Sequence, residues 1–307
     1  MHLGIGVGLS IGSVVVNIEV PIASPDQASA LSHVPLPEPA GKSPLNVPAD
    51  DAAPGTRRLR AMNKQRRGSR DRIALTTWPN GREAKVHCTI KLEWDRASAA
   101  HPRIVPITLV AYAFSQALKQ NPLANRRVVL WKIRPHKTVG ISFAVDEGDD
   151  LRIAVVTRAD ELNPKQVQHA LRIAARDARL GVGPLARCTR IVSYLPVVAG
   201  RPLLRIWSLL TAGLGIPMLG VPGAPFGAVL LSSVERFGLP AANVPLVPFT
   251  RCTFVCSVGA ITPSVIVRGG APVVVDVVEL SVSIDHRVCD ASQLASFLET
   301  FEAAFYK

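Results

Sequence analysis

One histidine of this chain has surroundings that suit acid–base chemistry. Leu280, Val282 and Ile284 alternate with polar residues, which predicts a half-buried strand, and His286 follows on the same apolar side as the strand ends. A buried imidazole with a pKa near neutrality can take a proton from a thiol or a hydroxyl. His286 is therefore our candidate general base.

Asp290, four residues after His286, is predicted to open an amphipathic helix. Apolar residues follow it at helical spacing: Leu294, Phe297, Leu298 and Phe301. A strand before and a packed helix after would hold the intervening turn rigidly. A purely structural interpretation competes with this one, because Asp290 and Gln293 also form a capping box and a strand-end histidine is commonly a satisfied core or surface residue.

The same segment resembles a known motif. Residues 285–291 read Asp-His-Arg-Val-Cys-Asp-Ala and resemble the DHRxxDG motif in the catalytic domain of 2-oxo acid dehydrogenase acyltransferases, with Ala291 in place of glycine. Other stretches resemble the same family in the same order along the chain: 107–122 its first long helix, 139–146 and 151–160 its central strands, and 227–238 the run that carries its oxyanion-stabilising hydroxyl. The resemblance covers residues 66 to 305.

The resemblance implies a fold and an assembly. The fold is an α/β two-layer sandwich with a large mixed sheet, similar to chloramphenicol acetyltransferase, and the assembly is a homotrimer with active sites in channels between subunits. The residue pattern independently favours a mixed α/β fold. It predicts strands at 86–94, 128–133, 138–145 and 151–156, and helices beginning at Ile107 and spanning 164–180.

The resemblance also implies roles for individual residues. His286 would accept the thiol proton of coenzyme A or of a reduced lipoyl group, and Ser232 would stabilise the oxyanion. Ser233 is the reserve candidate, since neighbouring strand residues face opposite ways. Asp290 would fix the loop through an ion pair with an arginine, either Arg70 or Arg72.

Length and composition fit one such domain. The chain has 307 residues, 48% of them apolar, which suffices for a catalytic domain at 66–307 with a tail before it. Residues 1–55 are predicted to be a disordered tail because 21–55 are rich in Pro, Ala and Asp. Residues 56–72 form a basic lead-in segment. No Lys or Arg precedes the apolar run at 1–20, so this run matches a secretory signal peptide poorly. The odd number of scattered cysteines favours a reducing, cytoplasmic environment.

Five cysteines are scattered without a C-x-x-C pair, so the pattern supports neither a disulfide framework nor a zinc site. Cys289 lies three residues after His286 and could be imagined as a nucleophile. We set it aside, because a reactive thiolate needs a positioned base and an orienting group, and the family has an apolar residue at this position.

The net charge of +12 is concentrated in the basic segment. Such a run could bind nucleic acid, an anionic membrane or an acidic partner, could steer coenzyme A, or could simply be solvated. No aromatic residue interleaves it, so we expect no specific nucleic-acid binding. A second unusual stretch, 202–221, is apolar but interrupted by Arg205 and Pro217, which predicts a buried or interface helix rather than a membrane span.

The sequence contains no lipoylation hairpin, so a lipoyl donor would have to arrive in trans, on a separate lipoyl-bearing protein or with dehydrogenase components. Two alternatives stay open. Ala291 and Glu235, both in place of glycines, favour a catalytically degenerate trimeric scaffold. An acyltransferase that uses a non-lipoyl hydroxyl acceptor is the other.

Overall fold

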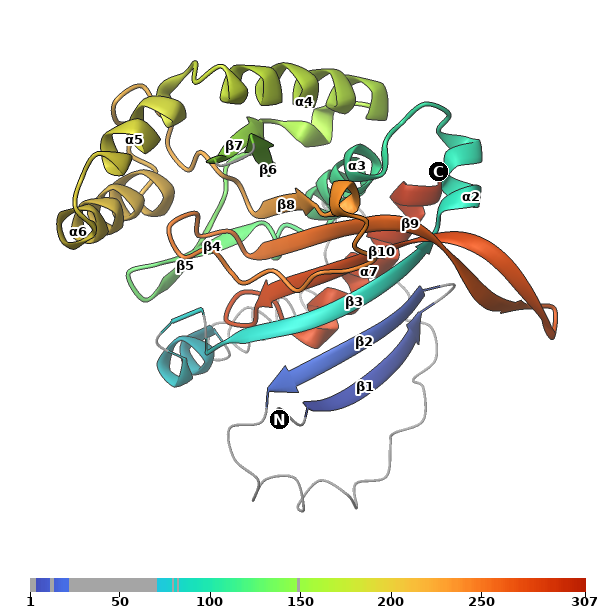
Figure 1. Ribbon diagram of the computed structural model, residues 1–307. Helices are drawn as coiled ribbons and strands as arrows, with labels where there is room; N and C mark the ends of the chain where they lie inside the picture. The colour runs from blue at the N-terminus through green and yellow to red at the C-terminus, as the bar shows by residue number, and fades with distance from the viewer. Residues whose placement is uncertain (1–3, 12–13, 22–70, 79, 82, 148–149) are drawn as a thin grey trace, which may run out of the picture.

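A large mixed β-sheet forms the centre of the molecule (Figure 1). The computed structural model describes residues 4–11, 14–21, 71–78, 80–81, 83–147 and 150–307. In sheet order the strands are β1 (Gly4–Ile11), β2 (Val14–Pro21), β3 (Lys85–Glu93), β10 (Ala271–Asp285), β9 (Phe254–Arg268), β8 (Val229–Ser233), β6 (Ile141–Glu147) and β7 (Asp150–Val156). Strand β8 runs parallel to both β6 and β9, whereas the other neighbours are antiparallel. The predicted mixed sheet is confirmed.

The helices are α2 (Trp94–Ala100), α3 (Pro106–Gln120), α4 (Pro164–Arg179), α5 (Pro184–Ser193), α6 (Val197–Ser208) and α7 (Ala291–Tyr306), with short helical turns η2 (Ala159–Glu161), η3 (Leu209–Gly213) and η4 (Glu235–Phe237). Helices α2, α3, α4 and α7 share the main core on one face of the sheet, whereas α5, α6 and η3 contribute to a smaller core with the opposite-facing residues of β8 and β9. Helices α3 and α7 share one core with the apolar side of β10. Phe254 of β9 stacks on Phe297 of α7, with ring centroids 5.0 Å apart. The predicted two-layer arrangement is therefore present.

The predicted helices begin and end where local chemistry requires. Helix α3 has Pro106 in its first turn and ends at Asn121, just before a proline that cannot continue it. Helix α4 begins at a capping box formed by Asn163 and Gln166, and α7 at one formed by Asp290 and Gln293. All three helical predictions are confirmed.

One strand prediction was wrong. Residues 128–133, expected to be a single strand, form the tip of a hairpin between β4 (Arg126–Val129) and β5 (Lys132–Pro135). Leu130 and Trp131 make the turn with φ angles of 44° and 62°. The turn escaped prediction because tight turns of this kind favour Gly, Asn and Asp, and two bulky apolar residues are typical of a strand instead.

The N-terminal segment also differs from expectation. Residues 4–21 lie within the stretch predicted to be a disordered tail, yet they form the hairpin β1–β2, and β2 pairs with β3. The missed signal is the alternation of Ile5, Val7, Leu9 and Ile11 with small residues, followed by the two-residue connection Gly12-Ser13. Residues 22–70, and with them most of the predicted tail and basic segment, lie outside the described residues.

A close backbone contact sets the start of β8. Gly227 has a φ of +68°, and a Cβ built on it would lie 1.9 Å from the carbonyl oxygen of Gly140, so no larger residue fits. This contact brings β8 against β6, where Ser232 pairs with Ala144. Among the described residues, no helix combines the length and the apolar character needed to cross a bilayer.

Candidate active site

The turn after β10 is tied to its neighbours on both sides. The backbone N–H of His286 donates to the carbonyl of Ala84 at 2.8 Å, and that of Asp285 donates to the carbonyl of Thr253 at 2.9 Å. The N–H groups of Val288 and Cys289 both donate to the carbonyl of Asp285, at 2.9 and 3.1 Å. The turn is thereby closed on itself and anchored to β3 and β9, which is the rigid support that the sequence predicted.

The imidazole of His286 has a defined orientation. Its Nδ1 lies 3.1 Å from the carbonyl oxygen of Cys289. Because a carbonyl can only accept, Nδ1 carries the proton, and in the neutral ring Nε2 then holds the lone pair. The ring is half-buried and meets the indole of Trp78 edge to face, with centroids 5.5 Å apart. His286 is thus oriented to accept a proton at Nε2.

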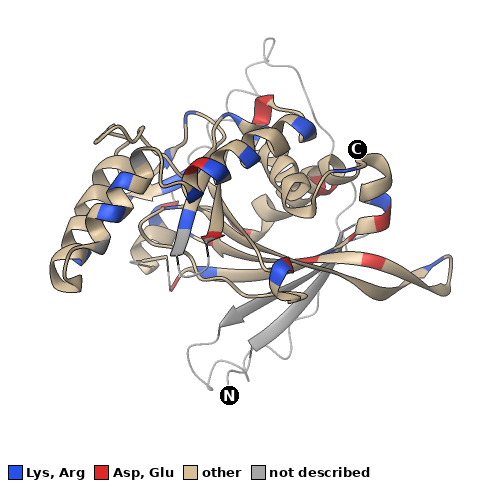
Figure 2. Cartoon of the chain, turned by 45° about the horizontal axis from the view of Figure 1, so that its top comes forward, with Lys and Arg blue, Asp and Glu red and all other residues tan. Residues whose placement is uncertain are grey.

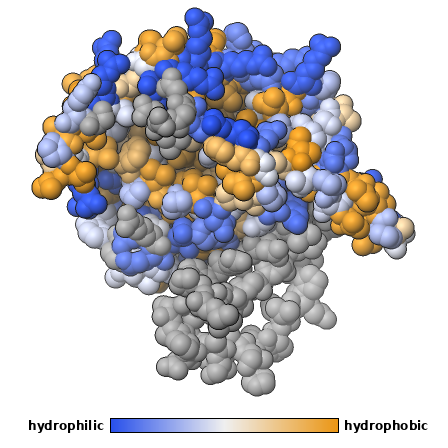
Figure 3. Space-filling model, in the orientation of Figure 1, coloured by the Kyte–Doolittle hydropathy of each residue, from blue (hydrophilic) through white to orange (hydrophobic). Residues whose placement is uncertain are grey.

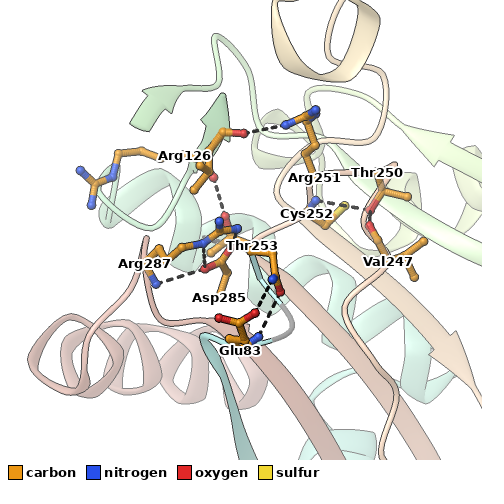
Figure 4. A network of polar contacts seen from close by, with 11 residues as sticks. Glu83, Arg126, Val247, Thr250, Arg251, Cys252, Thr253, Asp285 and Arg287 are labelled. Carbon is orange, nitrogen blue, oxygen red and sulfur yellow. Dashed lines mark hydrogen bonds and ion pairs between the residues drawn. The ribbon is translucent and has the colours of Figure 1, made fainter. Parts of the chain in front are cut away.

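The two sequence neighbours of His286, Asp285 and Arg287, form an ion pair with each other (Figure 4). Nε and Nη2 of Arg287 donate to the two carboxylate oxygens of Asp285 at 2.9 and 2.7 Å, and the backbone N–H of Arg287 adds a third bond of 3.1 Å. The side chains are only 11% and 9% exposed. Bidentate pairing of this kind is strong and directional, so it fixes the backbone around His286.

Arg126, at the start of β4, binds the same turn from the other side. Its Nη2 donates to the carbonyl of Val288 at 2.9 Å, and its Nη1 forms an ion pair of 3.2 Å with Asp71. Its own carbonyl accepts a hydrogen bond from Thr253 Oγ1, as Figure 4 shows. Sequence reasoning missed Arg126, because nothing in the local sequence around it points to a turn 162 residues further along the chain.

Asp290 serves as the N-cap of α7. Its Oδ1 accepts hydrogen bonds from the backbone N–H of Gln293 and from Ser292 Oγ, both at 2.8 Å. The Gln293 side chain returns a bond to the Asp290 N–H at 3.3 Å. This helix-capping role is the structural interpretation of Asp290 that the sequence also supported. The ion pair with Arg70 or Arg72 stays a prediction, since Arg70 lies outside the described residues.

Ser232 and Ser233 lie near the end of β8, both half-buried. Ser232 stands opposite Ser257 of β9, which in turn stands opposite Ser281 of β10. His286 follows Ser281 by five residues, and a strand rises by about 3.4 Å per residue. His286 is therefore two strands away from Ser232 and about 17 Å further along the strand direction. One copy of the chain does not bring Ser232 and His286 together.

A second histidine–serine contact exists but does not suit nucleophilic catalysis. His87 Nδ1 lies 3.0 Å from Ser283 Oγ, across the β3–β10 pair. The Ser283 hydroxyl donates to the carbonyl of Val244, so its proton is directed away from the imidazole. His87 therefore cannot act on this hydroxyl as a base in the described arrangement.

The cysteines are not placed for nucleophilic attack. Cys289 is 2% exposed and belongs to the main apolar core. Burial raises the pKa of Cys88 and that of Cys252 to about 12. Cys289 is set aside because its thiol is buried among apolar side chains, where an attacking group cannot reach it.

A cleft of about 580 Å³ opens beside the turn. Apolar side chains line it, including Leu75, Trp131 and Leu246, together with the guanidinium groups of Arg205, Arg251 and Arg287. Its one carboxylate, Asp285, is the partner of Arg287.

Arg251 is only partly satisfied in this cleft. Its Nη1 donates to the carbonyl of Val128 at 3.0 Å, but its buried Nε has no hydrogen-bond partner. Burial, and then the nearby charge of Arg287, lower the pKa of Arg251. The cleft combines an apolar lining with an excess of positive charge.

Comparison with known families identifies the chain. The model of the 2-oxoacid dehydrogenases acyltransferase catalytic domain matches residues 58–183 and 241–305, more than half of the sequence. The chain belongs to this acyltransferase family. The matched part includes His286 and Asp290, whereas Ser232 lies in the unmatched stretch 184–240. The family predicted from the motif is confirmed.

Solved structures agree on the fold. A probable dihydrolipoamide acetyltransferase from Listeria monocytogenes 4b F2365 is 19% identical, with a TM-score of 0.52 over 87% of this chain and 95% of the other. The cubic core of a pyruvate dehydrogenase multienzyme complex is 16% identical, with a TM-score of 0.53 over 85% and 98%. The dihydrolipoamide acetyltransferase of Azotobacter vinelandii is 19% identical, with a TM-score of 0.51 over 79% and 88%. Among curated proteins, none has a significantly matching sequence.

Proposed function

We propose that this acyltransferase moves an acyl group between coenzyme A and a thiol acceptor such as dihydrolipoamide. Nε2 of His286 takes the proton of the incoming thiol, and the thiolate attacks the thioester carbonyl. The tetrahedral intermediate then expels the second thiolate, which recovers the proton from the imidazolium. The observation that carries this proposal is the hydrogen bond from His286 Nδ1 to the Cys289 carbonyl, which leaves Nε2 as the acceptor.

Ser232 is proposed as the oxyanion donor, contributed by a neighbouring copy of the chain. The separation of Ser232 from His286 within one copy supports this assignment, because a site that needs both groups must then span two subunits. A homotrimer is the assembly we propose. In the Azotobacter enzyme, a serine, a histidine and an asparagine four residues after that histidine have been investigated for their role in the catalytic mechanism. Here Asp290 stands four residues after His286.

The cleft beside the turn supports coenzyme A as a substrate. Coenzyme A combines negatively charged phosphates with a long, weakly polar thiol arm, and the cleft combines guanidinium groups with apolar walls. Of the three arginines that line the cleft, Arg287 pairs with the carboxylate of Asp285. Arg205 and Arg251 form no ion pair with a carboxylate of the cleft lining. We propose that they contact the phosphates while the thiol arm extends toward His286.

Two alternatives remain, and each predicts a different outcome. A catalytically degenerate scaffold would bind partners without turnover. A transferase with a hydroxyl acceptor would transfer the acyl group from coenzyme A but ignore dihydrolipoamide. For a lipoyl acceptor, the lipoyl group would come from a separate lipoyl-bearing protein or with dehydrogenase components.

The test is acyl transfer from acetyl-coenzyme A to dihydrolipoamide by the purified chain, with His286→Ala alongside. Loss of a general base lowers turnover by about 10² to 10⁴-fold. His169→Ala, an exposed histidine on α4, is the matched control and should leave the rate unchanged. Equal rates for the wild type and a folded His286→Ala variant would contradict the proposal.

A further inference from the structure

Helices α5 and α6 form an arm that the family match does not cover, since it lies within the unmatched residues 184–240. The arm lies at one end of the molecule, at the upper left of Figure 1. Residues 178–234 contain five arginines and no aspartate or glutamate. In Figure 2 the two helices carry basic residues and no acidic ones. The proposed catalytic chemistry does not account for this composition.

The tip of the arm is apolar and exposed to an unusual degree. Tyr194, Val197 and Val198, at the junction of the two helices, are 83%, 67% and 87% exposed. Figure 3 shows apolar and hydrophilic side chains next to each other over this part of the surface. A cluster of exposed apolar residues rimmed by polar ones marks an interaction surface.

The side of α6 that faces the rest of the molecule is packed against residues of the chain itself. Ser208 Oγ donates to the carbonyl of Phe249 at 2.8 Å, and Trp207 meets Phe226 edge to face. The outward side is therefore a separate surface. Val198, Pro202 and Ile206 follow one another at four-residue spacing along it, which places them on one face.

Arginines flank this apolar face. On α6, Arg201 lies to one side of the outward residues, and α5 adds Arg187, both exposed. Within the described part of the chain, no carboxylate forms an ion pair with either of them. A helix that joins an apolar face with basic flanks has the composition of interfacial helices, which lie in the plane of a membrane surface.

From these observations we infer that the α5–α6 arm docks on the surface of an anionic lipid bilayer. The tip would enter the boundary between headgroups and acyl chains, and the arginines would contact acidic headgroups. A second copy of this chain fits the surface less well, because a symmetric contact would set the arginines of one arm against those of the other. This inference is independent of the proposed catalytic function.

The test is co-sedimentation of the full chain with vesicles of phosphatidylcholine and phosphatidylglycerol in a 3:1 ratio, beside vesicles of phosphatidylcholine alone. We expect binding to the anionic vesicles that weakens as salt is added. Val197→Asp together with Val198→Asp should abolish it. Arg187→Gln with Arg201→Gln should weaken it by about fivefold per arginine, roughly 25-fold in all.

Matched controls separate the arm from the rest of the basic chain. Arg103→Gln with Arg172→Gln removes two exposed charges elsewhere, and Val267→Asp alters an exposed apolar residue of β9; both should bind like the wild type. Equal binding to neutral vesicles, or equal losses in arm and control variants, would overturn the inference. So would a change of oligomeric state by light scattering in the Val197→Asp/Val198→Asp variant, which would assign the tip to contacts between copies.

Discussion

At the scale of single residues, the account rests on which nitrogen of His286 carries the proton. The Cys289 carbonyl fixes the proton on Nδ1, and the anchored turn keeps the ring in place. The candidate base could be predicted from the sequence, because a strand-end histidine before a capped helix is a local pattern. Its Nδ1 partner could not, since that contact depends on how the turn closes in space.

The oxyanion donor gives a prediction at the same scale. Ser232→Ala should lower turnover by about 10² to 10³-fold with little change in the affinity for coenzyme A, because the hydrogen bond strengthens only as charge develops on the oxygen. Steady-state kinetics with acetyl-coenzyme A would measure both quantities.

Ser233→Ala is the control for this prediction. Adjacent strand residues face opposite ways, so this variant should retain the wild-type rate. A large loss in Ser233→Ala with none in Ser232→Ala would exchange the two roles and reject our assignment of the strand face.

At the scale of elements, long-range contacts decide how firmly the turn that carries His286 is held. Arg126 joins β4 to the turn through the Val288 carbonyl and to Asp71 through an ion pair. Arg126→Met should lower the free energy of unfolding by about 2 to 3 kcal/mol, because it removes charged hydrogen bonds that are mostly shielded from water. Urea denaturation would measure the change.

Arg158→Met provides the comparison for Arg126. Arg158 also pairs with a carboxylate, Glu161, but the two side chains are 65% and 50% exposed. Water screens such a pair, so the loss should be clearly smaller than that of Arg126→Met. Equal losses in the two variants would show that the contacts of Arg126 do not stabilise the turn beyond an ordinary surface pair.

The cleft yields a second prediction about elements, since it lies where α6 and η3 approach the β4–β5 hairpin. Arg205→Gln should raise the KM for coenzyme A by about tenfold and leave kcat unchanged, because a phosphate contact is equally strong in the ground state and in the transition state. Arg201→Gln, about one helical turn before Arg205 on α6 and outside the cleft, should change neither value. A fall in kcat without a change in KM would contradict the assigned role.

The elements also show where sequence reasoning succeeds. Helices α3, α4 and α7 combine periodic apolar residues with clear start and stop signals, and their predicted positions agree with the structure. The β4–β5 hairpin failed because Leu130 and Trp131 make a turn with strand-like residues. Arg126 and the cleft depend on residues distant in the sequence, which no local pattern connects.

At the scale of the whole molecule, the account requires more than one copy of the chain. The sheet register separates Ser232 from His286 by two strands and about 17 Å along the strand direction. The cubic pyruvate dehydrogenase core shows that this fold forms large assemblies in a relative. The proposed active site, shared between neighbouring copies, would bring the two separated groups to one reaction.

Subunit mixing tests this claim most directly. His286→Ala and Ser232→Ala chains, each nearly inactive alone, would be unfolded together in equal amounts, refolded, and assayed for acetyl transfer to dihydrolipoamide. If each site takes its histidine from one copy and its serine from the next, random mixing restores both groups in about a quarter of the sites, and the mixture should recover about a quarter of the wild-type rate. A mixture that assembles like the wild type yet remains as inactive as its two components would contradict the account.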